Sequence, residues 1–519
     1  MAVVTISIQE LKKLTGLDKK DMLEQLSETG MPAEEGEGVL FVEVTPNRPD
    51  FFSIEGIVRT LNHLAGKAPR AYSMNSSEFK LVVDRSVGKQ RPYAISTVLK
   101  NVDMDEDVLK SMIQLQEKLH ETVGRKRKKV AIGMHNADAV TFPLTYKFVK
   151  NASFVPLDFS EEMDVQGVLA KHPKGQTYAH LVGPQYPMLC DQQGVISFPP
   201  IINSERTRVT AHTRNLVLDV TGTHQETLIG VLNILVCALA DRGGEIYGVA
   251  TGTKTYPELS WPAMPIKLKE ITKLLGEKIS KEDVQKHLAR MGWRIDAKGN
   301  ALVPPYRMDV SHYADMAEDI AISYGYNNFK PTLPGFFSIG SPNRAEDEFR
   351  DVMVGAGFLE MVNYVLTNQE KIANTKALKI INPKTEDFTL IRTALAASLL
   401  ENIASNKTQE HPLKIFEIGR VYDVEVGEEL RLGFAMCSDD VDFSVAKGML
   451  QTLMQAKNAE IELKGNDCGG LFIAGRGALI HHRSKKIGLL GEVSPEILEK
   501  MKIDFPVCIC EVNLKALAE

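Results

Sequence analysis

The sequence is poor in cysteine, which limits the chemistry that it can support. Only six cysteines occur among 519 residues, at positions 190, 237, 437, 468, 508 and 510, and none shows the paired spacing of a metal site. Cys508 and Cys510 alternate along an apolar segment, so we expect them to pack inside a strand. A disulfide-stapled domain is excluded. The composition is typical of a reducing compartment, and we expect a cytoplasmic protein.

Long hydrophobic runs are also missing. The best one, Leu228–Ala240, is interrupted by Asn233 and is too short to span a bilayer. Thr223 and Glu226 form a predicted capping box before it, and two glycines follow it, so we expect a buried helix. The N-terminus lacks the basic and apolar regions of an export signal. We therefore expect no membrane association.

A large excess of charge is missing too, because the formal net charge is only -6. The chain is therefore not a globally basic nucleic-acid binder, and any contact with RNA must come from a local patch. The obvious basic run is Arg125–Lys129. We expect it to be a solvated loop between a helix and a strand, and a contact with RNA is the alternative.

The length of the chain exceeds a single hydrophobic core, so we expect several domains. Proline-containing linkers and the pattern of predicted elements divide it at residues 1–85, 86–262, 263–336 and 337–519. The first two parts mix helices with strands, and the third carries three predicted helices. The last part is the most β-rich, and a broad antiparallel sheet with flanking helices is predicted there. The fold class is therefore α+β with several domains.

The most informative segment runs from Val303 to Asn327. Apolar residues recur at helical spacing from Tyr313 to Tyr324, which predicts a helix whose acidic face points away from the local core. Like charges at this spacing repel by about 0.2–0.5 kcal/mol per pair. The helix N-terminus, an arginine or a bound cation must offset that repulsion. The carboxylates at this spacing are Asp315, Glu318 and Asp319, and a fourth carboxylate, Asp309, precedes the helix.

A short pattern occurs twice. Pro46-x-Arg48-x-Asp50 and Pro305-x-Arg307-x-Asp309 each follow a valine-containing strand and precede a helix. The shared order of strand, motif and helix suggests two related small modules.

Another candidate site lies at the end of a predicted strand, in Asp219-Val220-Thr221-Gly222-Thr223. Short polar residues at a strand end lie beside free backbone donors, which is a common place for a site. The alternative is that Asp219 and Thr223 only organise the turn and cap the next helix.

The acidic segment, VPPYRMDVSHYADMAEDIAISYGYNN, resembles the β subunits of phenylalanyl-tRNA synthetases. That family has an Arg-x-Asp, an Asp six residues on, an acidic pair and a Tyr-Gly-Tyr-Asp/Asn ending. VEVTPNRPDFFSIEGIVRTL resembles its N-terminal module, and FPPIINSERTRV and LDVTGTH resemble its editing module. NPKTEDFTLIRTALAASLLENIASNK, FEIGRVYDVE and IGLLGEVSPEILEKM resemble its C-terminal module. The resemblance covers nearly the whole chain, in order.

The layout is similar to the archaeal and eukaryotic-cytosolic type, because we expect neither an oligonucleotide-binding insertion nor a C-terminal anticodon-binding module. The resemblance implies a small α/β N-terminal module, an α/β editing domain that binds tRNA, a winged-helix-like module of the DNA-binding type, and a class II synthetase-like core. It also implies an α2β2 heterotetramer that uses ATP to attach phenylalanine to tRNA(Phe), with the aminoacylation site in the α subunit.

The core of this chain lacks two arginines that class II enzymes use to neutralise polyphosphate. No arginine stands two residues before Glu417, and Gly475-Arg476-Gly477 leads into a predicted hairpin rather than a helix. We therefore expect that the chain alone activates no amino acid.

The resemblance implies two sets of site residues. Asp309, Asp315, Glu318 and Asp319 match the family's magnesium ligands, which are shared with α, and oxygen ligands suit Mg²⁺. Salt bridging and plain solvation are the alternatives. The second set belongs to a site that hydrolyses mischarged tyrosyl-tRNA(Phe), for which we assign no nucleophile and expect a positioned water. Its candidates are Leu189, Ser197, Asn203, Asp219 and Thr221.

Two rival functions fit parts of the pattern. One is a non-hydrolytic scaffold that binds tRNA or supports assembly, and deacylation of mischarged tRNA distinguishes it from editing. The other is a metabolic enzyme built on a class II core that works without a partner, and co-purification of an α subunit argues against it.

Overall fold

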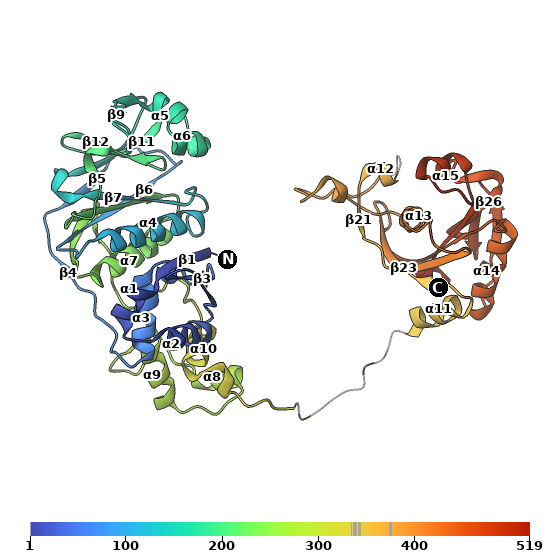
Figure 1. Cartoon of the computed structure of the whole chain (residues 1–519), viewed down its shortest axis with the longest axis horizontal. Coiled ribbons are helices and arrows are strands. Elements are labelled where there is room, and N and C mark those ends of the chain that lie inside the picture. The colour runs from blue at the N-terminus through green and yellow to red at the C-terminus, as the bar shows by residue number, and fades with distance from the viewer. Residues whose placement is uncertain (1, 334, 336–339, 341–343, 373–375, 519) are drawn as a thin grey trace. The chain divides into compact units, whose positions relative to one another are not determined.

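The structure is a computed structural model that describes residues 2–333, 335, 340, 344–372 and 376–518. It forms two compact units, residues 1–333 and 334–519 (Figure 1). Both units combine helices with sheets, which confirms an α+β chain of several domains. None of the described helices is long and apolar enough to cross a membrane. All six cysteines are free, and five of them are buried.

The N-terminal module is a three-stranded sheet, ordered β1-β3-β2, with three helices. Leu40, Val42 and Val44 alternate along its central strand and are fully buried. Helix α3 begins after Ser53, whose hydroxyl accepts the amide of Gly56. The elements are β1 (Ala2–Ser7), α1 (Ile8–Thr15), α2 (Lys19–Glu28), β2 (Ala33–Glu35), β3 (Val39–Val44) and α3 (Ile54–Leu64).

An eleven-stranded sheet forms the largest part of the N-terminal unit. Its strands follow the order β13-β12-β11-β8-β5-β15-β6-β14-β7, and β4 and β16 also pair with β15. Residues 74–83 supply β4 and β5, so part of the predicted N-terminal domain belongs to this sheet. The strands are β4 (Met74–Asn75), β5 (Lys80–Val83), β6 (Tyr93–Lys100), β7 (Val130–Asn136), β8 (Leu144–Val149), β11 (Tyr186–Asp191), β12 (Gly194–Phe198), β13 (Ile202–Asn203), β14 (Leu216–Gly222), β15 (Glu245–Thr251) and β16 (Lys254–Tyr256).

This sheet is curled so that its two ends meet. Strands β13 and β7 stand at opposite ends of the strand order. Nevertheless, the side-chain amide of Asn203 in β13 donates to the carbonyl of Met134 in β7 at 3.1 Å. Strand β14 lies between β6 and β7 and pairs antiparallel with both, which sets Asp219 opposite Gly133.

Two long helices, α4 (Glu106–Glu121) and α7 (Gln225–Ala240), contribute to the largest hydrophobic core beside this sheet (Figure 1). The helix predicted at Leu228–Ala240 lies within α7, which begins three residues earlier. The predicted cap of α7 is wrong by one residue, because His224 rather than Thr223 is the N-cap and its ring accepts the amide of Thr227. Two short helices, α5 (Val165–Lys171) and α6 (Pro173–Tyr178), follow the two-stranded sheet of β9 (Ser153–Phe154) and β10 (Met163–Asp164).

The last module of the N-terminal unit packs three helices around Trp293, which is fully buried. Its small sheet has the order β17-β19-β18. The elements are β17 (Ala263–Met264), α8 (Leu268–Leu275), α9 (Lys281–Arg290), β18 (Arg294–Ile295), β19 (Ala301–Leu302) and α10 (Tyr313–Tyr324).

The C-terminal unit is a seven-stranded sheet, ordered β20-β23-β24-β28-β27-β26-β25, and only the β20–β23 pair is parallel. Helix α14 belongs to one hydrophobic core of this unit, and α13 and α15 belong to another, so both faces of the sheet are covered. The main elements are α11 (Arg344–Gly355), β20 (Leu359–Glu360), β21 (Leu366–Thr367), β22 (Leu390–Ile391), α13 (Ala396–Ser405), β23 (Leu413–Asp423), β24 (Gly427–Cys437), α14 (Phe443–Ala456), β25 (Glu462–Gly465), β26 (Phe472–His482), β27 (Lys485–Val493), α15 (Pro495–Met501) and β28 (Val507–Asn513).

Candidate functional site

A cavity of about 340 Å³ lies where the two ends of the curled sheet meet. Strand β7 lines it from Ala131 to Met134, and the segment 197–204 lines it from the other end of the sheet. Helix α4 contributes side chains that include Glu117, and β14 contributes Asp219. A concave site of this size with a few polar groups suits a small ligand or the end of a larger one.

Asp219 is buried at this cavity and is held by a histidine. Its Oδ1 lies 2.8 Å from Nε2 of His135, and Nδ1 of His135 lies 2.8 Å from the hydroxyl of Thr207. A ring nitrogen that faces a carboxylate carries the hydrogen, so Nε2–H donates to Asp219 and Nδ1 accepts from Thr207. Among the described residues, Oδ2 of Asp219 has no hydrogen-bond partner. The cavity therefore offers one free carboxylate oxygen to a ligand.

Gly133 permits this close approach. A Cβ atom at this position would lie 2.0 Å from Oδ1 of Asp219 and 2.8 Å from Nε2 of His135. Both distances are too short for a carbon atom, so only glycine leaves room for the pair at this point of β7.

Three of the five residues predicted for hydrolysis gather at the cavity, namely Ser197, Asn203 and Asp219. The Ser197 hydroxyl donates to Oδ1 of Asn203 at 3.0 Å, and the amide of Asn203 ties this wall to β7. The other two lie outside the lining. Leu189 is fully buried in a hydrophobic core, and Thr221 accepts a hydrogen bond from Arg91 at 2.9 Å.

The residues that fix Asp219 were not among the predicted ones. His135 and Thr207 come from segments far from Asp219 in the sequence, and a histidine within an otherwise apolar predicted strand was the only signal for His135. Arg91 was missed as well. Burial lowers the pKa of Arg91 to about 10, and the neighbouring Tyr146 hydroxyl and Asp219 carboxylate oppose part of that decrease.

The segment 122–129 joins α4 to β7 beside the cavity, and one of its residues departs from the predicted solvated loop. Arg127 lines the cavity and is only 4% exposed. Its guanidinium donates to the carbonyls of Pro200 and Ile201 and to Glu117. Arg125, Lys126 and Lys128 are exposed, as expected.

Arg125, Lys126 and Arg127 all have left-handed backbones, with φ of 48°, 53° and 65°. Such a conformation costs on the order of 1–3 kcal/mol for each non-glycine residue. A cation near the C-terminus of a helix such as α4 contributes about 0.3–1 kcal/mol, which is too little to offset that cost. The loop is held instead by the side-chain contacts of Arg127 and by two backbone hydrogen bonds. The amide of Lys126 donates to the carbonyl of Glu121, and the amide of Arg127 donates to the carbonyl of His120.

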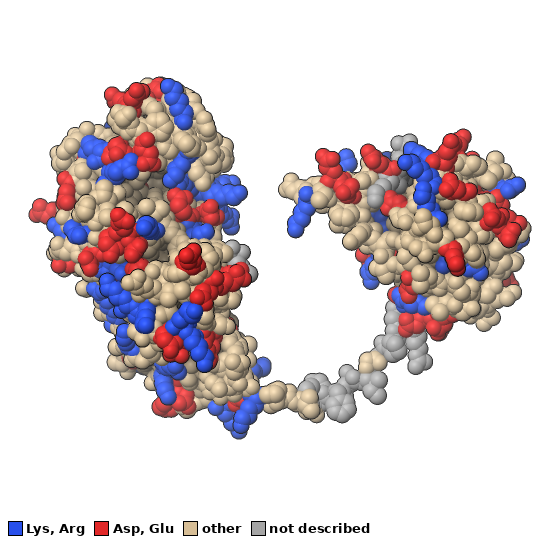
Figure 2. All heavy atoms as spheres, viewed as in Figure 1, with Lys and Arg blue, Asp and Glu red and all other residues tan. Residues whose placement is uncertain are grey.

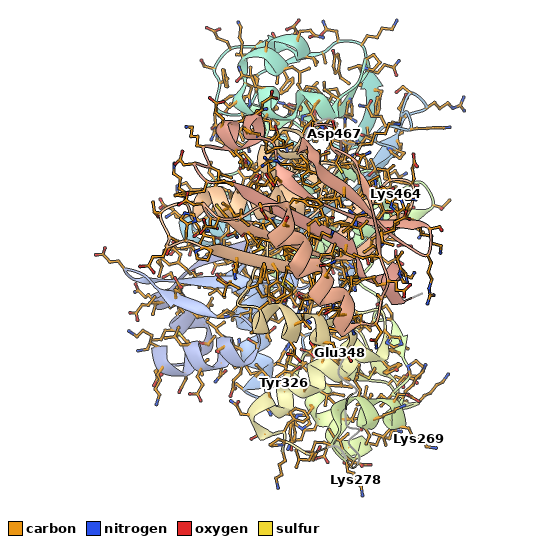
Figure 3. The ribbon with its side chains drawn as sticks, turned by 90° about the vertical axis from the view of Figure 1, so that its right-hand side faces the viewer. Lys269, Lys278, Tyr326, Glu348, Lys464 and Asp467 are labelled. Atoms are coloured by element: carbon orange, nitrogen blue, oxygen red, sulfur yellow. The ribbon has the colours of Figure 1, made fainter. Side chains whose placement is uncertain are left out.

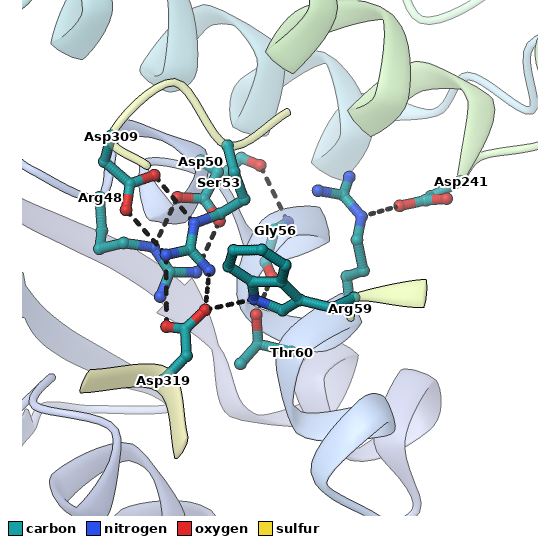
Figure 4. Close-up of polar contacts among 11 residues, drawn as sticks. Arg48, Asp50, Ser53, Gly56, Arg59, Thr60, Asp241, Asp309 and Asp319 are labelled. Carbon is teal, nitrogen blue, oxygen red and sulfur yellow. Dashed lines mark hydrogen bonds and ion pairs between the residues drawn. The ribbon is translucent and has the colours of Figure 1, made fainter. Parts of the chain in front are cut away.

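The carboxylates of the acidic segment divide into two pairs, and Arg307 binds the first pair (Figure 4). Nε and Nη2 of Arg307 each lie 2.8 Å from Asp309, and Nη1 lies 2.6 Å from Asp319. The indole of Trp293 also donates to Asp319, at 2.6 Å. Because Asp319 is 1% exposed, the expectation that this acidic face points away from the core is wrong for this residue.

Arg307 and its carboxylates stabilise one another's charges. Burial alone lowers the pKa of Arg307, but Asp319 and Asp309 outweigh it and raise that pKa well above the ordinary value. In the same way, burial raises the pKa of Asp309, and the hydrogen bonds and charge of Arg307 outweigh this effect and lower it.

Asp315 and Glu318 form the second pair and have different partners. Asp315 accepts the amides of Ser311 and His312 at 2.7 Å each and so caps the N-terminus of α10. Glu318 is exposed and accepts the hydroxyl of Tyr326 at 2.7 Å; Tyr326 is labelled in Figure 3. The helix N-terminus and an arginine therefore offset the repulsion predicted along this helix.

The two P-x-R-x-D patterns have the same local geometry. Nε and Nη2 of Arg48 bind Oδ1 and Oδ2 of Asp50 at 2.9 and 2.8 Å, as the same atoms of Arg307 bind Asp309. Figure 4 draws Arg48 and Asp50 in one cluster of polar contacts with Asp309 and Asp319. The sequence pattern thus corresponds to a repeated ion pair at the junction of the first and third modules.

A magnesium ion was tested against these contacts. Among the described residues, no group of three or more His, Cys, Asp or Glu side chains is placed to hold a metal ion. The four carboxylates therefore do not form a self-contained site within this chain. A magnesium site completed by another subunit stays a prediction.

Known proteins similar to this chain cover its whole length. Residues 264–326 match the family described as the tRNA synthetase B5 domain, and residues 332–514 match the phenylalanyl tRNA synthetase beta chain CLM domain. The chain is 38% identical to the phenylalanine–tRNA ligase β subunit of Archaeoglobus fulgidus, over 99% of this chain and 98% of that protein. It is 35% identical to that of Methanocaldococcus jannaschii, over 99% and 100%.

A solved structure is similar to the N-terminal part. It is an N-terminal fragment of the phenylalanyl-tRNA synthetase β subunit from Pyrococcus horikoshii, with a TM-score of 0.59 and 34% identity. The similarity covers 62% of this chain and 99% of the fragment.

Replacement of Arg307 by glutamine is expected to destabilise the N-terminal unit, because two carboxylates then lose their buried counterion. The expected loss in the free energy of unfolding is about 3–5 kcal/mol. Only two tryptophans are present, so a Trp261→Phe background leaves Trp293 as the sole fluorescent reporter of urea unfolding. Glu318→Gln is the matched control and should leave the transition where it was. Equal transitions for both variants would contradict this assignment.

Proposed function

The chain belongs to the family of phenylalanine–tRNA ligase β subunits, and on that premise we propose that it serves in an α2β2 heterotetramer that attaches phenylalanine to tRNA(Phe) at the expense of ATP. The match to relatives along 99% of the chain supports this proposal, because it also spans 98% and 100% of those two proteins. A cytoplasmic location agrees with the free cysteines.

The partner surface that we propose for α lies on the C-terminal unit. Apolar side chains in the segment 359–366 and at Ile381 are unusually exposed, among them Val362 at 92%, Tyr364 at 78% and Ile381 itself at 87%. Exposed apolar groups close together on a surface are typical of an interaction site. An α subunit that covers them would remove them from water.

Aminoacylation itself belongs to α in this proposal. In the class II-like core, the carboxylate of Glu417 already has a buried partner, since Arg392 binds it at 2.7 Å and both side chains are 3% exposed. Arg476 pairs with Glu492, also at 2.7 Å. The buried Arg392 is therefore not free to neutralise a polyphosphate, and Arg476, whose side chain is 59% exposed, would have to give up Glu492 to do so.

The chain purified alone is therefore expected to catalyse no ATP–pyrophosphate exchange with phenylalanine. Addition of the α subunit should restore exchange, and an α-only sample is the control for the contribution of β. Exchange by β alone would place the activation site in this chain and refute the division of labour.

The cavity is proposed to be the site that hydrolyses mischarged tyrosyl-tRNA(Phe). Its chemistry rests on one observation, the free Oδ2 of the buried Asp219 carboxylate, which can accept a hydrogen bond from the phenolic hydroxyl of tyrosine. An apolar pocket rejects an added hydroxyl by only about 10²-fold, whereas a site that must bond that hydroxyl rejects phenylalanine by about 10⁴–10⁵-fold. A second site of this kind is therefore useful to a ligase for phenylalanine.

His135 acts in this proposal as a positioning residue. It occupies Oδ1 of Asp219 and so leaves Oδ2 for the ligand, while Thr207 sets the position of the ring hydrogen. Ser197 donates its hydrogen to Asn203, and no general base in the described part of the chain bonds its hydroxyl, so in this proposal a positioned water serves as the nucleophile.

Asp219→Ala should let tyrosyl-tRNA(Phe) accumulate while the rate of phenylalanylation stays at its parental value. The reason is that only the editing cavity loses its acceptor for the phenolic hydroxyl. The measurement is charging with labelled tyrosine and, in parallel, with labelled phenylalanine, using the chain purified with α. Asp138→Ala removes an exposed carboxylate from the same domain and serves as the control. Full clearance of tyrosyl-tRNA by the Asp219 variant would refute this role.

A magnesium ion shared with α is the remaining proposal, and of the four predicted ligands Asp315 and Glu318 have no buried arginine as their partner. Oxygen ligands supplied from two chains would suit an ion that keeps several waters. Asp309 and Asp319 could take part only by sharing their oxygens with Arg307.

The double variant Asp315→Asn/Glu318→Gln tests that ion. Magnesium should stabilise the parental heterotetramer against dissociation, measured by sedimentation with magnesium or with EDTA, and the double variant should lose that dependence. The same dependence in both proteins would exclude these two residues as ligands.

A further inference from the structure

The loop beside the cavity carries positive charges that this chain does not neutralise. Arg125, Lys126 and Lys128 are exposed, and they form no ion pair within the described part of the chain. Figure 2 shows both basic and acidic side chains on the visible face, and the formal net charge of the chain is -6. A small unneutralised group is therefore local to this loop rather than part of a generally basic surface.

The cations that line the cavity are different, because each has a carboxylate partner. Arg127 and Lys174 bind Glu117, at 2.9 and 3.3 Å. Arg208 binds Glu205 at 2.7 Å and also binds Asp158. Beside the cavity, Arg125, Lys126 and Lys128 are therefore the cations that remain available to an anion from another molecule.

The backbone of these three residues lies next to a residue that lines the cavity. Consecutive Cα atoms are about 3.8 Å apart, so the Cα atoms of Lys126 and Lys128 lie within ~4 Å of the Cα atom of Arg127. Arg127 itself lines the cavity. Three successive left-handed residues are strained, and the buried guanidinium of Arg127 holds them in place through Pro200 and Ile201. Strain that the surrounding structure maintains in this way is typical of functional sites.

We infer that Arg125, Lys126 and Lys128 bind the phosphates of the single-stranded 3′ end of tRNA and guide its aminoacyl ester into the cavity. A basic track for the backbone combined with a separate pocket is a general way to bind a single strand. The charges fit this ligand, since unneutralised cations stand outside the cavity and the free carboxylate oxygen of Asp219 stands within it. This inference rests on the proposed hydrolysis of tyrosyl-tRNA.

The test is a triple variant, Arg125→Gln/Lys126→Gln/Lys128→Gln, of the chain purified with α. Its KM for deacylation of tyrosyl-tRNA(Phe) should rise about tenfold to a hundredfold, and the salt slope of log KM should fall by about 2, because each contact to a single strand contributes ~0.7. The value of kcat should stay within twofold of the parent. Hydrolysis of tyrosyl-adenosine, which lacks the tRNA phosphates, should not change.

The matched control is Lys12→Gln/Lys13→Gln/Lys20→Gln, which removes the same charge from exposed positions on α1 and α2. A loop variant that behaves like this control would overturn the inference. A parallel loss of tyrosyl-adenosine hydrolysis would also overturn it, because the loop would then only support the cavity. If the parent hydrolyses neither substrate, the proposed editing function fails. The binding of tRNA by the loop is then tested separately, by filter binding of uncharged tRNA to the same variants, which compares their affinity and salt slope.

Discussion

The cavity of the N-terminal unit depends on the hydrogen bond between His135 and Asp219. A carboxylate that is almost completely buried needs a partner, and His135 satisfies one of its oxygens while the other stays free. The pair exists only because β7 and β14 are neighbours in register and because Gly133 leaves room between them. The curl of the sheet then brings the segment 197–204 over the pair and turns a buried contact into a cavity.

Buried charged side chains are also paired with a partner where the first and third modules meet. Arg307 has two carboxylate partners and Arg48 has one, and the two arginines use the same pair of nitrogens for their own Arg-x-Asp motif. The loss of an arginine at such a point leaves a charge without a partner, which is why these pairs matter more to the fold than exposed ones. Glu318 on helix α10, by contrast, is exposed, and its carboxylate accepts the hydroxyl of Tyr326 rather than an arginine.

Local signals in the sequence were sufficient for much of the fold. The apolar run Leu228–Ala240, with a polar start and two glycines after it, predicted a buried helix, and that run lies within α7. The site was harder to predict, because His135, Thr207 and Asp219 come together only when distant strands pair. Periodicity also could not show that Asp319 is buried, since its partner Arg307 lies outside the helix. Arg127 looked like one more residue of a solvated basic run, and only the tertiary structure separates it from its neighbours.

A β subunit with its own hydrolytic cavity would let the ligase correct errors that the α subunit cannot avoid. The most direct test is the ratio of kcat/KM for hydrolysis of tyrosyl-tRNA(Phe) to that of phenylalanyl-tRNA(Phe), measured with the chain purified together with α. A site that must bond the phenolic hydroxyl through Asp219 predicts a ratio of about 10⁴ or more. A ratio near one, or no hydrolysis of either ester, would contradict the account.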